Sequence, residues 1–155
     1  MLELRELVGV ILNSSVQKNG IKVSSSNNLL QELLDGIISG AFSTDLEAST
    51  RLYQTDPSYE NYRKLKERLK SRLYDKILQI DFNNALHNEA QKVYYTCHKQ
   101  ISIVQILLAK SARYSTIRLA EKLLKKAERY HLTNLSLELS TILRGHYANN
   151  HGDIK

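Results

Sequence analysis

The sequence predicts an all-α fold in which antiparallel helical hairpins stack as a short α-solenoid of about six or seven helices. Apolar residues recur three and four positions apart along most of the 155 residues, which is the spacing of one helix face. The chain has only 1 proline and 6 glycines, too few for a turn-rich β protein. A chain of this length can bury its own core, so we expect one all-helical domain over residues 1–155. Within it, residues 1–82 form an N-terminal part and residues 84–155 the later hairpins.

Composition describes an ordinary soluble chain. Hydrophobic residues make up 42% and charged residues 25% of the sequence, which is typical of a folded protein. The single cysteine, Cys97, excludes an internal disulfide and fits a reducing compartment. Residues 1–12 contain Glu3 and Glu6 and only a short apolar run, so they do not resemble a secretory signal. We therefore expect a cytoplasmic protein without a membrane segment.

The first two predicted helices are separated by a polar segment. Leucines and other aliphatic residues at helical spacing predict a first helix over residues 2–13. The segment 14–28 contains Asn19-Gly20 and a polar run, which predict a loop, with a small hairpin as the alternative. Asn27 or Asn28 then caps a second helix, which ends near Gly40.

Two further helices are predicted around Pro57. Thr44 or Ser43 is a suitable cap for a short helix with Leu46, Ala48 and Leu52 facing inward. Pro57 fits the first turn of a helix, because its missing N–H has no helical partner to lose. A long helix is therefore expected to begin beside Pro57 and to run to about Ile80.

Three helices complete the predicted architecture. Apolar positions keep helical phase over residues 86–108, with a break near Gln100 as an alternative. A further helix is expected over residues 116–130 and a last one over residues 133–148.

Small and large apolar residues are arranged in a recurrent way in the last third of the chain. Leu107 on one helix and Ala120, Leu124 and Ala127 on the next are placed where paired helices approach and interlock. In this pattern the chain resembles the tetratricopeptide repeat family, whose helix pairs stack into solenoids. The resemblance implies a scaffold whose helix faces or groove hold another protein.

An incomplete second pair follows. Leu143, Tyr147 and the turn Gly152-Asp153-Ile154-Lys155 resemble the first helix and turn of another repeat. Because each repeat covers the apolar face of its neighbour, the last helix would keep part of its face uncovered. We expect the chain to be a fragment of a longer protein, or a second copy to cover this face as a homo-oligomer.

Residues 44–77 suggest an alternative function. They resemble the helix-turn-helix of some bacterial regulators, in which the second helix enters the DNA major groove, and some such regulators also carry tetratricopeptide repeats. The residues that this resemblance would place on DNA are Asn61, Arg63 and Lys64 toward bases and Lys66, Lys70 and Arg72 toward phosphates.

The same charges have a plainer explanation. A half-buried helix needs a solvated face, and Glu60 stands four residues before Lys64 in the favourable orientation for a helical ion pair. Asp56 and Glu60 also place negative charge where DNA would approach. The sequence therefore favours a solvated face over a DNA-reading one.

A second basic strip lies opposite the apolar face of the predicted helix 116–130. Its members are Arg118, Lys122, Lys125, Lys126 and Arg129. The formal net charge of the chain is +6, so an acidic protein partner is a reasonable hypothesis. Tyr59, Tyr95 and Tyr114 are further candidates for a recognition surface, because they depart from the main helix stripes or sit at helix ends.

The sequence offers little catalytic or metal-binding chemistry. Cys97 and His98 are adjacent, but Cys97 lies in the apolar phase of its helix, as an inert core thiol would. The 5 histidines lack the spacing of a metal pair, and no glycine-rich loop follows a strand. We expect a non-enzymatic interaction scaffold without a cofactor, with a DNA-binding regulator as the alternative.

Overall fold

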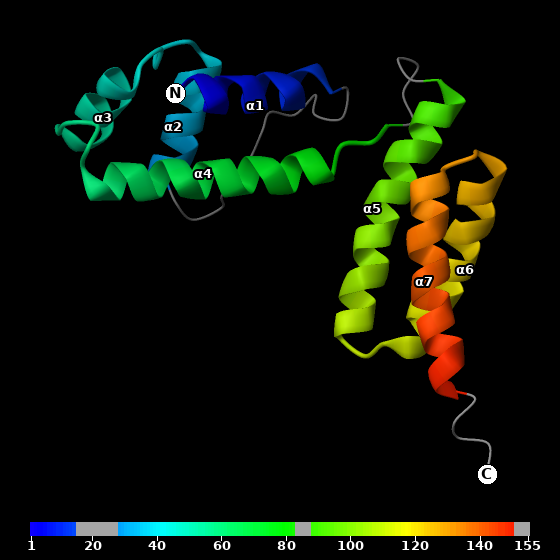
Figure 1. Cartoon of the computed structure of the whole chain (residues 1–155). Coiled ribbons are helices and arrows are strands. Elements are labelled where there is room, and N and C mark those ends of the chain that lie inside the picture. The colour runs from blue at the N-terminus through cyan, green and yellow to red at the C-terminus, as the bar shows by residue number, and fades with distance from the viewer. Residues whose placement is uncertain (15–27, 83–87, 151–155) are drawn as a thin grey trace. The chain divides into compact units, whose positions relative to one another are not determined.

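The computed structural model describes residues 1–14, 28–82 and 88–150, and these ranges contain seven helices and no strand. The helices are α1 (Leu2–Asn13), α2 (Asn28–Ile38), α3 (Asp45–Tyr53), α4 (Glu60–Leu78), α5 (Glu89–Ala109), α6 (Arg113–Arg129) and α7 (Thr133–Asn150) (Figure 1). The predicted all-α class is confirmed. Most of the segment expected as a loop at 14–28 and the turn expected at Gly152-Asp153 lie outside the described residues.

The chain divides into two compact units, Met1–Asp81 and Phe82–Lys155. The subdivision expected from the sequence placed its boundary between residues 82 and 84. Each unit has its own buried cluster of apolar side chains. Each unit therefore has the separate core that is typical of a compact folding unit.

The first unit is built on the long helix α4. Helix α1 packs against α4, and α2 contacts α1, α3 and α4. The buried stripe of α4 is Tyr62, Leu65, Leu69 and Leu73, spaced three and four residues apart as one helix face requires. Leu33 and Leu34 of α2 are fully buried in the same core.

Helices α3 and α4 depart from the sequence-based expectation in two places. Leu46 was expected to face inward but is 58% exposed, because Ala48 and Ser49 take the buried positions of α3. Pro57 was expected in the first turn of the long helix, but it lies in the preceding turn and α4 begins at Glu60. Local capping interactions, and not the apolar periodicity, decide the residue at which a helix begins or ends.

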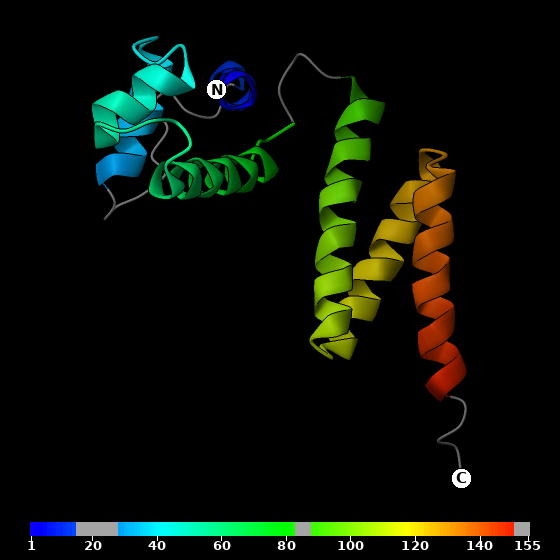
Figure 2. The ribbon, with the colours of Figure 1, turned by 60° about the vertical axis from the view of Figure 1, so that its left-hand side comes forward.

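The second unit consists of α5, α6 and α7, which run side by side in alternating directions (Figures 1 and 2). Its core includes Cys97 and Val104 of α5, Ala120 and Leu123 of α6, and Leu139 of α7. Helix α5 is continuous, and the alternative break near Gln100 is wrong.

The same tight turn joins both pairs of neighbouring helices in this unit. The N–H of Ala112 donates to the carbonyl of Leu107 at 2.9 Å, and the N–H of Leu132 donates to the carbonyl of Ala127 at 2.8 Å. Both bonds span five residues, as in a Schellman motif. The residue with positive φ is Ser111 in one turn (59°) and His131 in the other (54°). The two hairpins therefore share one turn geometry, while the repeat resemblance and stacking as a solenoid stay predictions.

Helices α5 and α6 cover most of the apolar face of α7. Leu135, Leu139 and Leu143 are buried against α5 and α6. Leu137 points away from them and is 70% exposed. None of the described helices combines the length and apolarity that crossing a membrane requires.

Candidate partner-binding surfaces

Two cations of α4 lie against acids of other helices. The ammonium nitrogen of Lys66 is 2.6 Å from a carboxylate oxygen of Asp45, and that of Lys70 is 2.7 Å from Glu3. Both lysine side chains are only partly exposed. The DNA-binding hypothesis assigned Lys66 and Lys70 to phosphates, but their charges are already engaged within this unit.

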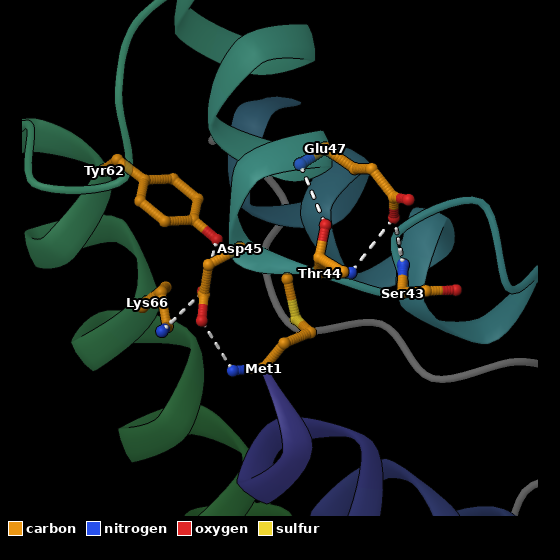
Figure 3. Close-up of polar contacts among 7 residues, drawn as sticks. All are labelled: Met1, Ser43, Thr44, Asp45, Glu47, Tyr62 and Lys66. Carbon is orange, nitrogen blue, oxygen red and sulfur yellow. Dashed lines mark hydrogen bonds and ion pairs between the residues drawn. The ribbon is translucent and has the colours of Figure 1, made fainter.

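Asp45 is the centre of the more buried of these contacts (Figure 3). It accepts hydrogen bonds from the ammonium group of Met1 at 2.8 Å and from the hydroxyl of Tyr62 at 2.8 Å, in addition to the contact with Lys66. Burial raises the pKa of Asp45, but the bonds from Lys66, Met1 and Tyr62 together outweigh burial and hold its pKa well below the usual range. Burial and the neighbouring Asp45 carboxylate both raise the pKa of Tyr62. Asp45 therefore ties α3 to α1 and α4.

The start of α3 positions Asp45. The backbone N–H of Glu47 donates to the hydroxyl of Thr44 at 3.2 Å, and the Glu47 carboxylate accepts from the N–H groups of Thr44 at 3.0 Å and Ser43 at 2.7 Å (Figure 3). The bonds from Thr44 and Ser43 lower the pKa of Glu47. This capping box identifies Thr44, one of the two expected residues, as the cap and fixes the helix end at which Asp45 is the first residue.

The contact between Lys70 and Glu3 joins α4 to α1. The hydroxyl of Tyr74 also donates to Glu3, at 3.1 Å. The hydrogen bond from Lys70 lowers the pKa of Glu3 against the effect of desolvation, and the same bond raises the pKa of Lys70. The Glu3 side chain is 57% exposed and that of Asp45 is 33% exposed, so the contact at Glu3 adds less to stability than the one at Asp45.

The other candidate DNA-binding residues lie on the exposed face of α4. Lys64 forms the predicted ion pair with Glu60 at 2.6 Å. The amide of Asn61 donates to the hydroxyl of Tyr59 at 2.8 Å, and Arg63 and Arg72 are exposed. Three of the six candidates, Lys64, Lys66 and Lys70, are thus paired with acids.

The basic strip of α6 has a different environment. We define the α6 strip as Arg118, Lys122, Lys125, Lys126 and Arg129, of which Lys126 is half-buried and the others are exposed. Within the part of the chain that the structure describes, none of the five has a carboxylate at ion-pair distance. Burial raises the pKa of the Cys97 thiol, and the nearby charge of Lys126 opposes that effect only in part. Among the described residues, the α6 strip is therefore a set of cations without an acidic partner.

An exposed tyrosine lies at the N-terminal end of the α6 strip. Tyr114 is 74% exposed, and the guanidinium carbon of Arg118 lies 5.6 Å from the centroid of its ring. Arg118 also donates a hydrogen bond to the Tyr114 hydroxyl at 3.0 Å. The ring therefore restrains Arg118 by a cation–π contact, and most of the tyrosine side chain stays exposed.

An open surface hollow lies on each of the two basic helices, α4 and α6. One, of about 730 Å³, is lined by α4 residues that include two acids, Glu60 and Glu67, among four bases. The other, of about 600 Å³, is lined by the α6 strip with Glu121 and Tyr130. Of these two hollows, the one on α6 therefore has the larger excess of bases over acids.

The three tyrosines proposed for recognition are all exposed, but two of them already pack on other rings. Tyr59 meets Tyr53 edge-on at 5.5 Å between centroids, and Tyr95 stacks on Phe82 at 4.5 Å. Sequence reasoning missed Asp45 and Glu3 as partners of the α4 lysines, since each pair is far apart in the chain. For Asp45 the only sequence signal is its place directly after the Thr44 cap.

Among the described residues, neither the α4 surface nor the α6 strip carries a metal-binding cluster. Among the residues described, no three histidine, cysteine, aspartate or glutamate side chains are placed to hold a metal ion. Comparisons of the chain with protein-family models, with curated proteins and with solved structures found no match. Its resemblance to tetratricopeptide repeats and to a helix-turn-helix accordingly stays a prediction.

Proposed function

We propose that the chain is a non-enzymatic interaction scaffold that binds an acidic segment of another protein through the α6 strip. The observation that carries this proposal is the set of five cations on α6 without an intramolecular ion pair in the described part of the chain. Like charges four residues apart, such as Lys122 and Lys126, cost a helix a few tenths of a kcal/mol per pair. An acidic partner would remove that cost and replace it with attraction.

The strength expected of such a surface is moderate. Exposed ion pairs contribute about 0.2–1 kcal/mol each, so five of them support specificity and a fast association rate more than high affinity. Tyr114 adds an aromatic group of the kind that anchors interfaces. We place the complex in the cytoplasm, because the free thiol of Cys97 suits a reducing compartment.

A pair of charge-reversal variants tests the proposal. Lys122→Glu/Lys126→Glu inverts the centre of the α6 strip, and Arg63→Glu/Arg68→Glu makes the same change of charge on α4. Chemical crosslinking in cells followed by affinity capture should recover an acidic protein with the wild type and the α4 variant but not with the α6 variant. Equal recovery with both variants would remove the α6 strip from the binding surface.

A DNA-binding regulator stays the alternative function. Its support is the exposure of Arg63 and Arg72 on α4. Against it, Lys66 and Lys70 already pair with acids of α3 and α1. Filter binding to duplex DNA over a range of salt would decide, because each phosphate contact steepens the fall of log affinity with log salt by about 0.9.

A second copy of the chain is a further candidate partner. Leu137 on α7 is an isolated exposed leucine in a helix whose other leucines are mostly buried. One such residue is common on monomers, so it supports self-association only weakly. Light scattering over a dilution series would show a mass that falls with concentration if this face is an interface.

A further inference from the structure

The α6 strip is straight and narrow. Arg118, Lys122, Lys125 and Arg129 are separated by four, three and four residues. At 1.5 Å and 100° per residue they extend over about 16 Å and lie within an arc of about 60°. Lys126 widens the strip by about another 40° on one side. The strip therefore presents one row of charges along three turns of helix.

A row of acids borders the α6 strip on the opposite side from Lys126. Glu121 and Glu128 are seven residues apart, so they lie on the same side, two turns from each other. Glu121 accepts a hydrogen bond from the hydroxyl of Tyr147 at 2.5 Å, which ties its carboxylate toward α7. A ligand that is uniformly negative would meet repulsion from this border.

From these two rows we infer that the partner segment on the α6 strip is an acidic α-helix, an inference that rests on the proposed function. Carboxylates at positions i, i+4, i+7 and i+11 of a helix repeat at the spacing of the α6 cations. A row of lysines beside those carboxylates would face Glu121 and Glu128. The border of acids would then select against nucleic acid and against unstructured acidic chains.

The N-terminal end of the α6 strip specifies one more feature of the partner. Tyr114 lies one turn before Arg118, about 6 Å along the helix axis, and is 74% exposed. An apolar side chain one turn beyond the carboxylate row would cover that ring. The expected ligand is thus an amphipathic helix with acidic, basic and apolar positions in a fixed order.

Three probes of the full chain test the inference. The first is a helical peptide of about 20 residues with glutamates at i, i+4, i+7 and i+11, lysines on the flanking row and one leucine for Tyr114. The second has the same composition with the glutamates spread around the helix. The third is a duplex DNA of similar length. Fluorescence anisotropy at about 50 mM salt gives the affinities, and circular dichroism reports helix formation on binding.

We expect the in-phase peptide to bind at least about tenfold more tightly than the spread peptide and than the duplex, since several surface ion pairs together reach the 1.4 kcal/mol of a tenfold change. Lys122→Glu/Lys126→Glu should lower its affinity at least tenfold. A peptide with two glutamates changed to lysine should restore binding to that variant. Lys122→Gln/Lys126→Gln is the milder variant, should the reversal disturb folding.

The outcomes separate this inference from the proposed function. Equal binding of both peptides would overturn the helical partner and leave an acidic partner in place. Tighter binding of the duplex, with a steep dependence on salt, would overturn the helical partner in favour of nucleic acid. If no probe binds, and no acidic protein is captured in the cell experiment, both proposals fail.

Discussion

The two basic helices of this protein carry similar charges in different surroundings. On α4, Lys66 and Lys70 reach Asp45 and Glu3 of other helices, so these cations help to hold the first unit together. On α6, the strip points away from the buried face of its helix and meets no carboxylate among the described residues. A run of lysines becomes a candidate binding surface only when the fold leaves it without acids.

The largest expected effect is the loss of stability of the first unit when Asp45 is removed. Asp45→Ala removes the acceptor of a buried tyrosine hydroxyl and of Lys66, so we expect the free energy of unfolding of the first unit to fall by about 2 kcal/mol. Hydrogen exchange of amides in α3 and α4 measures that unit by itself. The control is Asp75→Ala on the exposed face of α4, which should change stability by less than about 0.5 kcal/mol. Equal effects would mean that the Asp45 contacts add nothing.

The pH dependence of the first unit tests the same contacts without a large structural change. The pKa of Asp45 is lower in the folded chain than its ordinary value of 3.8, so its contribution to stability is present above that value and is lost as the pH falls below it. We expect the protection factors of amides in α3, which are corrected for the slower intrinsic exchange at acid pH, to fall as the pH drops from about 5 towards about 2. Asp45→Asn should make this loss of protection smaller, while the lowered pKa values of Glu3 and Glu47 leave part of it. An unchanged profile in Asp45→Asn would contradict the role of Asp45.

Local interactions were predictable from the sequence, and distant ones were not. The cap at Thr44 and the ion pair of Glu60 with Lys64 depend on residues three and four apart, and both were confirmed. The pair of Lys66 with Asp45 joins residues on different helices, so its prediction requires knowing how those helices pack. The exposure of Leu46 has the same cause, because the packing of α3 selected Ala48 and Ser49 for the interior. The candidate strip on α6 could be proposed from periodicity, but its lack of acidic neighbours could not.

Removing one lysine from α4 and one from α6 should change the free energy of unfolding of their units in opposite directions. Lys66→Met deletes a partly buried partner of Asp45, and we expect it to destabilise the first unit by about 1 kcal/mol. Lys122→Met deletes a cation whose neighbours at i−4 and i+4 are Arg118 and Lys126, so it should stabilise α6 by a few tenths of a kcal/mol. Denaturant titrations followed by hydrogen exchange in each unit give both values. Destabilisation of the second unit by Lys122→Met would show that Lys122 has a partner within the chain.

The smallest expected effect is the response of the two units to salt. Salt screens both the attraction between the α4 lysines and their acids and the repulsion among the cations of α6. The screening length is already about 10 Å at 0.1 M salt. Between about 0.05 and 0.5 M sodium chloride, local opening of α4 should become slightly easier and that of α6 slightly harder, by a few tenths of a kcal/mol each. Hydrogen exchange on the same sample reads both helices, so each is the control for the other. A shift of the same sign in both helices would mean that the α6 cations are paired within the chain as those of α4 are, and the contrast between the helices would then disappear.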